Sequence, residues 1–179
     1  MSDNLIIRPL AGTDSIEEIT ELLHRAYKQL ADMGLRYMAT HQDSEVTKER
    51  LGTDHSFVAE IDGRIIGTIT CYGSENTKGS PYLDIAGVGH LGQLGVEPSL
   101  QGRGIGSRLF ARAEDHAHKI GLQELALDTA ESATHLIEWY KRLGYRFIEY
   151  AQWDVTNYRS VIMGKRLSIL NGHVRDQSH

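Results

Sequence analysis

A glycine-rich segment between a strand and a helix is the feature that most limits how this 179-residue chain can fold. Residues 94–107 read Leu-Gly-Val-Glu-Pro-Ser-Leu-Gln-Gly-Arg-Gly-Ile-Gly-Ser. An apolar strand ends at Val96, and an amphipathic helix follows the glycines at 102, 104 and 106. The first N–H groups of a helix have no intrahelical partner, and glycine leaves them uncovered. This segment therefore predicts a phosphate-binding turn.

The glycine spacing excludes two common phosphate-binding loops. The Walker loop requires Lys before Ser or Thr, but Ser107 follows Gly106 directly. The dinucleotide fingerprint Gly-x-Gly-x-x-Gly requires glycine at 107 or 109, where Ser and Leu stand. The remaining pattern, Gln101-x-x-Gly104-x-Gly106, resembles the pyrophosphate loop of the GCN5-related N-acetyltransferase (GNAT) superfamily.

A second motif lies on a predicted helix nearer the C-terminus. Residues 133–145 read Ala-Thr-His-Leu-Ile-Glu-Trp-Tyr-Lys-Arg-Leu-Gly-Tyr. They look like the later motif of the same superfamily, Ala-x-x-Leu…Tyr-x-x-x-Gly-Phe/Tyr, and Tyr140 stands where its members place a tyrosine. The two motifs occur in the right order, and the resemblance covers roughly residues 5–168.

Apolar periodicity and turn residues predict alternating strands and helices. Thr13 or Asp14 is the expected N-cap of a helix over 14–31, and Asp43 or Ser44 that of a helix over 44–51. Asp62-Gly63 is a strong hairpin signal. The other expected elements are strands at 5–8, 57–61, 64–72, 85–96, 124–128, 145–153 and 158–167, and helices at 103–120 and 132–143.

This order, β-α-α-β-β-β-α-β-α-β-β, predicts an α/β (α+β) fold. By resemblance to the GNAT superfamily, helices flank a mixed, mostly antiparallel sheet of about seven strands. The chain lacks linker-like segments, so we expect a single domain over residues 1–179, with a core over 5–168 and a flexible tail over 169–179. The glycines of the 85–96 strand suggest a bulge or a close backbone approach.

Composition narrows the compartment and the partners. The chain has no apolar run of membrane-spanning length and no signal-peptide pattern at its N-terminus, and Cys71 is its only cysteine. We therefore expect a cytoplasmic protein without a disulfide or a membrane anchor. The net charge of −5 argues against general nucleic-acid binding.

Charge is unevenly spread along the chain. Residues 14–62 contain 11 acidic and 5 basic side chains, whereas residues 101–119 contain 4 basic and 2 acidic ones. Such a field suits an anionic cofactor and a cationic acceptor, and it equally fits ordinary solvated helix surfaces.

The resemblance implies that acetyl-CoA is the cofactor. Backbone groups of the strand at Leu94, Gly95 and Val96 would hold the pantetheine arm like an added strand, and a backbone N–H near Val96 would stabilise the oxyanion. It also implies a splay between this strand and the strand at 124–128. The loop residues expected to bind the pyrophosphate are Gln101, Gly102, Arg103, Gly104, Ile105, Gly106 and Ser107.

Two side chains are candidates for proton transfer. Tyr140 is the expected acid for the departing thiolate, although its helix face also suits a core residue. His90 aligns with a general-base glutamate of histone-modifying members, and it is either the base or a structural histidine beside a water chain. Gln93 and Asp84 are weaker alternatives, as positioning groups.

The sequence offers neither a metal site nor a nucleophile. His116 and His118 are two residues apart on a helix, so they project to different sides. Cys71, in an apolar strand, is expected to be a core residue. We therefore expect direct attack of the amine on the thioester, with no metal and no acyl-enzyme.

The acceptor is not readable from a motif. The resemblance places an acceptor pocket near Arg36, Tyr37, Gln42 and Asp43, and the last hairpin adds Trp153, Asn157 and Tyr158. A small-molecule primary amine, possibly cationic, is the first expectation. A protein amine and a non-catalytic acyl-CoA-binding module are the alternatives, and a homodimer remains possible.

Overall fold

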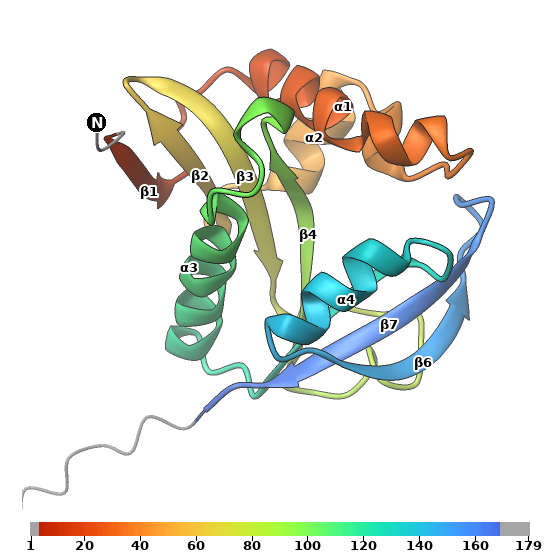
Figure 1. Ribbon diagram of the computed structural model, residues 1–179. Helices are drawn as coiled ribbons and strands as arrows, with labels where there is room; N and C mark the ends of the chain where they lie inside the picture. Colours follow the sequence, from red (N-terminus) through yellow and green to blue (C-terminus); the bar gives the residue numbers. More distant parts are fainter. Residues whose placement is uncertain (1–3, 169–179) are drawn as a thin grey trace, which may run out of the picture.

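A seven-stranded sheet forms the centre of the computed structural model, which describes residues 4–168 (Figure 1). The strands are β1 (Leu5–Pro9), β2 (Ser56–Ile61), β3 (Arg64–Tyr72), β4 (Val88–Val96), β5 (Glu124–Ala130), β6 (Arg146–Gln152) and β7 (Arg159–Arg166). The helices are α1 (Ile16–Asp32), α2 (Ser44–Leu51), α3 (Ile105–Lys119) and α4 (Thr134–Arg142), with short 3-10 turns η1 (Met38–Thr40), η2 (Ser74–Asn76) and η3 (Pro98–Leu100).

The strand order is β1-β2-β3-β4-β5-β7-β6. Only β4 and β5 pair in parallel, and every other pair of neighbours is antiparallel. The predicted fold class and element order are therefore confirmed. The expected tail at 169–179 lies outside the described residues.

Three predicted helix starts were wrong. Ser15, not Thr13 or Asp14, caps α1 and accepts a hydrogen bond from the Glu18 N–H at 3.2 Å, because the Asp14 carboxylate binds Arg8 instead. The other two helices begin two residues later than expected, α3 at Ile105 and α4 at Thr134. For α3 the reason is that Gly104 has φ +80°, in the left-handed region.

Three other boundaries follow from local chemistry. β4 begins at Val88 rather than at residue 85, because Gly87 turns the chain with φ +85°. The N-cap of α2 is Asp43, as predicted, and its carboxylate accepts from the Val46 N–H at 2.9 Å. Gly144, with φ +97°, follows the last turn of α4 and ends it as expected.

Helices cover both faces of the sheet. A Cβ added to Gly95 would lie 3.0 Å from Leu23 of α1, so α1 packs closely on one face of β4. A Cβ added to Gly67 would lie 3.0 Å from Leu109 of α3, on the other face. The Phe110 and Trp139 rings meet edge to face at 5.3 Å, which joins α4 to α3. None of the helices within the described chain has the length and apolar character needed to cross a membrane.

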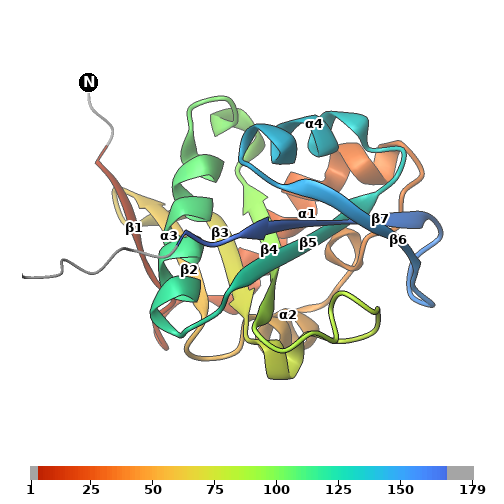
Figure 2. The same ribbon diagram turned by 90° about the horizontal axis from the view of Figure 1, so that it is seen from below.

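The two parallel strands separate after a short common stretch. β4 and β5 pair only at Val88↔Glu124, Gly89↔Leu125 and His90↔Ala126, and both strands then continue without further pairing to each other. Figure 2 shows the two strands diverging in the middle of the sheet. The predicted splay is therefore present. The predicted bulge is present too, because β4 shifts register opposite Thr68–Thr70.

Candidate active site

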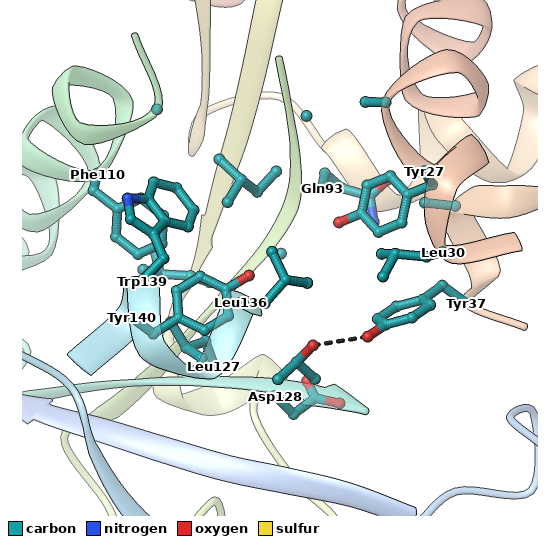
Figure 3. A pocket seen from close by; sticks show the side chains of 18 of the residues that line it. Tyr27, Leu30, Tyr37, Gln93, Phe110, Leu127, Asp128, Leu136, Trp139 and Tyr140 are labelled. Carbon is teal, nitrogen blue, oxygen red and sulfur yellow. Dashed lines mark hydrogen bonds between the residues drawn. The ribbon is translucent and has the colours of Figure 1, made fainter. Parts of the chain in front are cut away.

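The splay between β4 and β5 opens into a cleft of about 830 Å³, seen from close by in Figure 3. Eleven predicted site residues line it: His90, Leu94, Gly95, Val96, Gln101, Gly102, Gly104, Ile105, Gly106, Ser107 and Tyr140. Arg103, also predicted for the loop, is not among the lining residues. The structure thus brings the two sequence motifs to one cavity.

The glycine loop presents uncovered backbone to the cleft. Gly102 and Gly104 have φ of +79° and +80°, and no atom lies within 4 Å of the position of a Cβ on either one. The first intrahelical bond of α3 runs from the Arg108 N–H to the Gly104 carbonyl at 3.1 Å, and no side chain caps the N–H groups of residues 105–107. This arrangement fits a diphosphate.

Gly106 serves a different purpose from the other two loop glycines. A Cβ at this position would lie 3.0 Å from the Trp139 ring, so the glycine lets α4 pack against the start of α3. The loop motif and the α4 motif are therefore linked by direct packing.

Tyr140 lies on α4 with its hydroxyl directed into the cleft (Figure 3). The residue is 8% exposed, and within residues 4–168 its hydroxyl has no hydrogen-bond partner. Burial raises the pKa of Tyr140 well above its ordinary value of 10.0. The phenol therefore keeps its proton at neutral pH and is available to a ligand.

His90 forms a pair that the sequence did not predict. Its Nε2 lies 2.8 Å from Asp128 Oδ1, and the Trp153 indole N–H donates to Asp128 Oδ2 at 3.0 Å. Burial acts to raise the pKa of Asp128, but the hydrogen bond and charge of His90 and the hydrogen bond from Trp153 bring it below its ordinary value. The carboxylate stays ionised, so a neutral His90 carries its proton on Nε2 and leaves Nδ1 as the acceptor.

Four further aromatic side chains line the cleft. Tyr27, Tyr37, Trp153 and Tyr158 all line it. The Tyr37 hydroxyl lies 2.7 Å from Thr129 Oγ1 and accepts from the Ala130 N–H at 2.9 Å, which fixes its ring beside β5 (Figure 3). The predictions for Tyr37, Trp153 and Tyr158 as lining residues are confirmed.

Four other predicted acceptor residues lie outside the cleft lining. Asn157 accepts from the Arg36 N–H and donates to the Gly34 carbonyl, both at 2.8 Å, so it ties two loops together. Gln42 is buried at 2% exposure, and Asp43 is used as the cap of α2.

Of the two weaker positioning candidates, Gln93 lines the cleft and Asp84 does not. Asp84 is exposed and accepts from the Gly79 N–H at 3.1 Å, away from the cleft. Gln93 lines the cleft with a positive φ of 50°, in the bulge of β4. Such a backbone conformation costs a non-glycine residue about 1–3 kcal/mol, which makes Gln93 a strained position beside the site.

The acidic side chains on which the expectation of a cationic acceptor rested lie away from the cleft lining. None of the 11 acidic residues of segment 14–62 lines the cleft. Asp128 is the one carboxylate among the lining residues, and it is engaged by His90 and Trp153. The lining cations are Arg50, Lys78 and Arg142, of which none was singled out from the sequence.

Cys71 lies in the core, as predicted. It is 0% exposed, and burial raises the pKa of its thiol to about 12. We expect the folded protein to resist alkylation by iodoacetamide at pH 8. Mass spectrometry of the treated native protein, with guanidinium-unfolded protein as the reactive control, measures this resistance. Rapid labelling of the native chain would contradict the burial.

Within residues 4–168 no three His, Cys, Asp or Glu side chains are grouped to hold a metal.

Comparison with known proteins places this cleft in a family. The sequence model of the Acetyltransferase (GNAT) family matches residues 16–145. The chain belongs to the GNAT family. Its members use acetyl-CoA, and the match spans both the glycine loop and the α4 motif.

Characterised relatives of this GNAT chain include two Bacillus subtilis enzymes. The S-(2-succino)cysteine N-acetyltransferase is 33% identical over 138 residues, which are 76% of this chain and 81% of the relative. The S-alkylcysteine N-acetyltransferase is 28% identical over 151 residues, 81% of this chain and 80% of the relative. The chain is accordingly an N-acetyltransferase.

Solved structures agree on the fold. The Escherichia coli ribosomal-protein-S18-alanine N-acetyltransferase superposes with a TM-score of 0.68 at 17% identity, covering 95% of this chain and 98% of that one. A Salmonella typhimurium structure with its cofactor acetyl-CoA gives a TM-score of 0.67 at 19% identity, covering 93% and 95%.

Proposed function

We propose that the chain transfers an acetyl group from acetyl-CoA to the primary amine of a small molecule by direct attack. Acetyl-CoA supplies an activated thioester, so the nitrogen–carbon bond forms as the carbon–sulfur bond breaks. The N–H groups of residues 105–107 bind the diphosphate, and the backbone of β4 at Leu94, Gly95 and Val96 binds the pantetheine arm.

In this proposal two side chains move the protons. His90 Nδ1 accepts the amine proton, with Asp128 holding Nε2–H. The Tyr140 hydroxyl donates a proton to the departing sulfur, and a backbone N–H near Val96 stabilises the oxyanion. Burial weakens Tyr140 as an acid, but the same burial destabilises a thiolate, so the pKa values of the phenol and of the departing thiol rise together.

One observation carries the proposal. The Tyr140 hydroxyl and the uncovered N–H groups of the glycine loop face the same cleft, and neither forms a hydrogen bond with a side chain of the described residues. A module that only held acyl-CoA would have no need of an unpartnered, buried phenol at the splay.

Relatives suggest the first acceptors to test. Because two of them are named for cysteine conjugates, S-substituted cysteines head the panel. Free thiol is measured while purified protein and acetyl-CoA are mixed with S-substituted cysteines, other amino acids, polyamines and alanine-terminated peptides. Acetylation of small amines supports the proposal, acetylation of peptides alone favours a protein acceptor, and CoA binding without thiol release favours the binding module.

The glycine loop gives a separate prediction about cofactor binding. Gly104→Ala places a Cβ on a residue with left-handed φ, so the loop must shift. Its N–H groups then no longer point towards the diphosphate. We expect the Kd for CoA to rise by about tenfold or more, measured by calorimetry. Gly121→Ala is the matched control, because Gly121 has φ +82° and open space but lies outside the cleft. Equal CoA affinity in the two variants would contradict the assignment of the loop.

A further inference from the structure

The cleft contains an arginine, Arg50, that forms no ion pair with a carboxylate within residues 4–168, although its charge helps to lower the pKa of Asp128. Arg50, in the last turn of α2, donates to Gln42 Oε1 at 2.8 Å. Its guanidinium nitrogens also lie 3.0–3.1 Å from one end of the Gln93 amide, which presents its oxygen to them when the amide is turned from the orientation in which Gln42 Nε2 donates to Gln93 Oε1. No Asp or Glu among residues 4–168 forms an ion pair with Arg50, whereas Arg8 and Arg25 each meet a carboxylate at 2.8 Å.

Neutral amides fix this guanidinium without cancelling its charge. An arginine has five N–H donors, and two amide oxygens cannot use them all. The unused donors form a planar fork, which matches the two oxygens of a carboxylate. The site is therefore held in place and still able to bind an anion.

The backbone around Gln93 is shaped for this contact. Gln93 is 3% exposed and adopts a positive φ of 50° in the bulge of β4. The bulge directs its amide towards Arg50 of α2 and towards Gln42, which precedes that helix and is also buried. A strained residue in a buried polar cluster marks a position that the fold maintains for a purpose.

Arg50 and His90 are connected through one residue. The Tyr72 hydroxyl donates to the Arg50 carbonyl at 2.6 Å, and the Tyr72 and His90 rings stack with centroids 6.1 Å apart. Asp128, the carboxylate in the lining, is already bound by His90 and Trp153, so Arg50 is open to an anion from outside.

We propose that Arg50 binds the carboxylate of the acceptor, so that the chain acetylates the α-amine of an amino acid in preference to an amine without a carboxylate. In the proposed complex the α-amine, one carbon away from that carboxylate, is directed towards His90, which lines the same cleft. The inference rests on the proposed acetyl transfer and adds its substrate class and a specificity-determining residue.

The test compares two acceptors that differ in one group, S-methylcysteine and S-methylcysteinamide, in steady-state thiol-release assays. In the wild type we expect a higher kcat/KM for the amino acid. Arg50→Gln should lower that value by about 10- to 100-fold, mainly through KM, while the amide changes by less than about threefold. Gln93→Glu should have the same effect, because the new carboxylate occupies Arg50. Lys48→Gln, an exposed cation on the same helix, is the control and should change neither acceptor.

The assays distinguish failure of the proposed carboxylate site from failure of the proposed acetyl transfer. A wild type that uses both acceptors equally, or an Arg50→Gln variant that loses both equally, overturns the carboxylate site and leaves acetyl transfer standing. Absence of thiol release with every acceptor overturns the proposed function and this inference with it. A CoA-induced rise in melting temperature verifies that each variant is folded, and Arg50→Lys, which keeps the charge but not the fork, should fall between wild type and Arg50→Gln.

Discussion

Tyr140→Phe is expected to lower kcat by about 100-fold or more and to leave the Kd for CoA within about twofold of wild type. The substitution removes the hydroxyl and nothing else, and among residues 4–168 this oxygen forms no hydrogen bond. The departing sulfur would then leave without a proton donor, whereas cofactor contacts and packing against Phe110 and Trp139 would remain. Single-turnover kinetics and calorimetry measure the two quantities separately.

The pH profile provides the control for this variant. Because burial raises the pKa of Tyr140 well above 10.0, the phenol stays protonated through the alkaline working range. Its ionisation should therefore cause no loss of wild-type activity below about pH 10. Wild-type turnover in Tyr140→Phe at any pH would remove Tyr140 from the mechanism.

Asp128→Asn is expected to reduce kcat by about 100-fold through the tautomer of His90. Asp128 accepts from both His90 and Trp153, but an asparagine offers one oxygen and one NH2 group. The Trp153 indole can only donate, so it keeps the oxygen, and the NH2 group faces His90 Nε2. The proton then moves to Nδ1, and the proposed base loses its acceptor. Nitrogen NMR of His90 reports the tautomer directly.

A double variant separates this effect from simple damage. In Asp128→Asn with Trp153→Phe the indole donor is absent, so the asparagine oxygen is free to turn towards His90. Activity should recover relative to Asp128→Asn alone, when each is compared with the matching Trp153 background. Additive losses, with the Nε2–H tautomer retained throughout, would mean that Asp128 does not position the base.

Local signals explain why the fold was predictable. Asp62-Gly63 and the alternate glycines before α3 each specify a backbone conformation without help from distant residues. The splay was implied by family resemblance, and the small residues of β4 are consistent with it. The N-cap of α1 was misassigned because Asp14, a good cap by type, is engaged by Arg8 from β1.

The most informative additions to the site depend on long-range contacts. Asp128 acquires its role from His90, 38 residues away, and Arg50 acquires its role from the bulge at Gln93. Neither residue is unusual in its local sequence. The acidic count of segment 14–62 has the same limit, because a segment's charge does not say which side chains face a cleft.

The short ladder between β4 and β5 also bears on how long the protein survives. Only three residue pairs join the two halves of the sheet there, so the remaining facing edges of β4 and β5 are not paired with each other. A ligand that pairs with β4 occupies this unpaired edge. At a concentration of 100 times its Kd, such a ligand adds about 2.7 kcal/mol to the free energy of unfolding. Proteases act on opened chains, so a shortage of the acetyl donor would shorten the lifetime of the enzyme that consumes it.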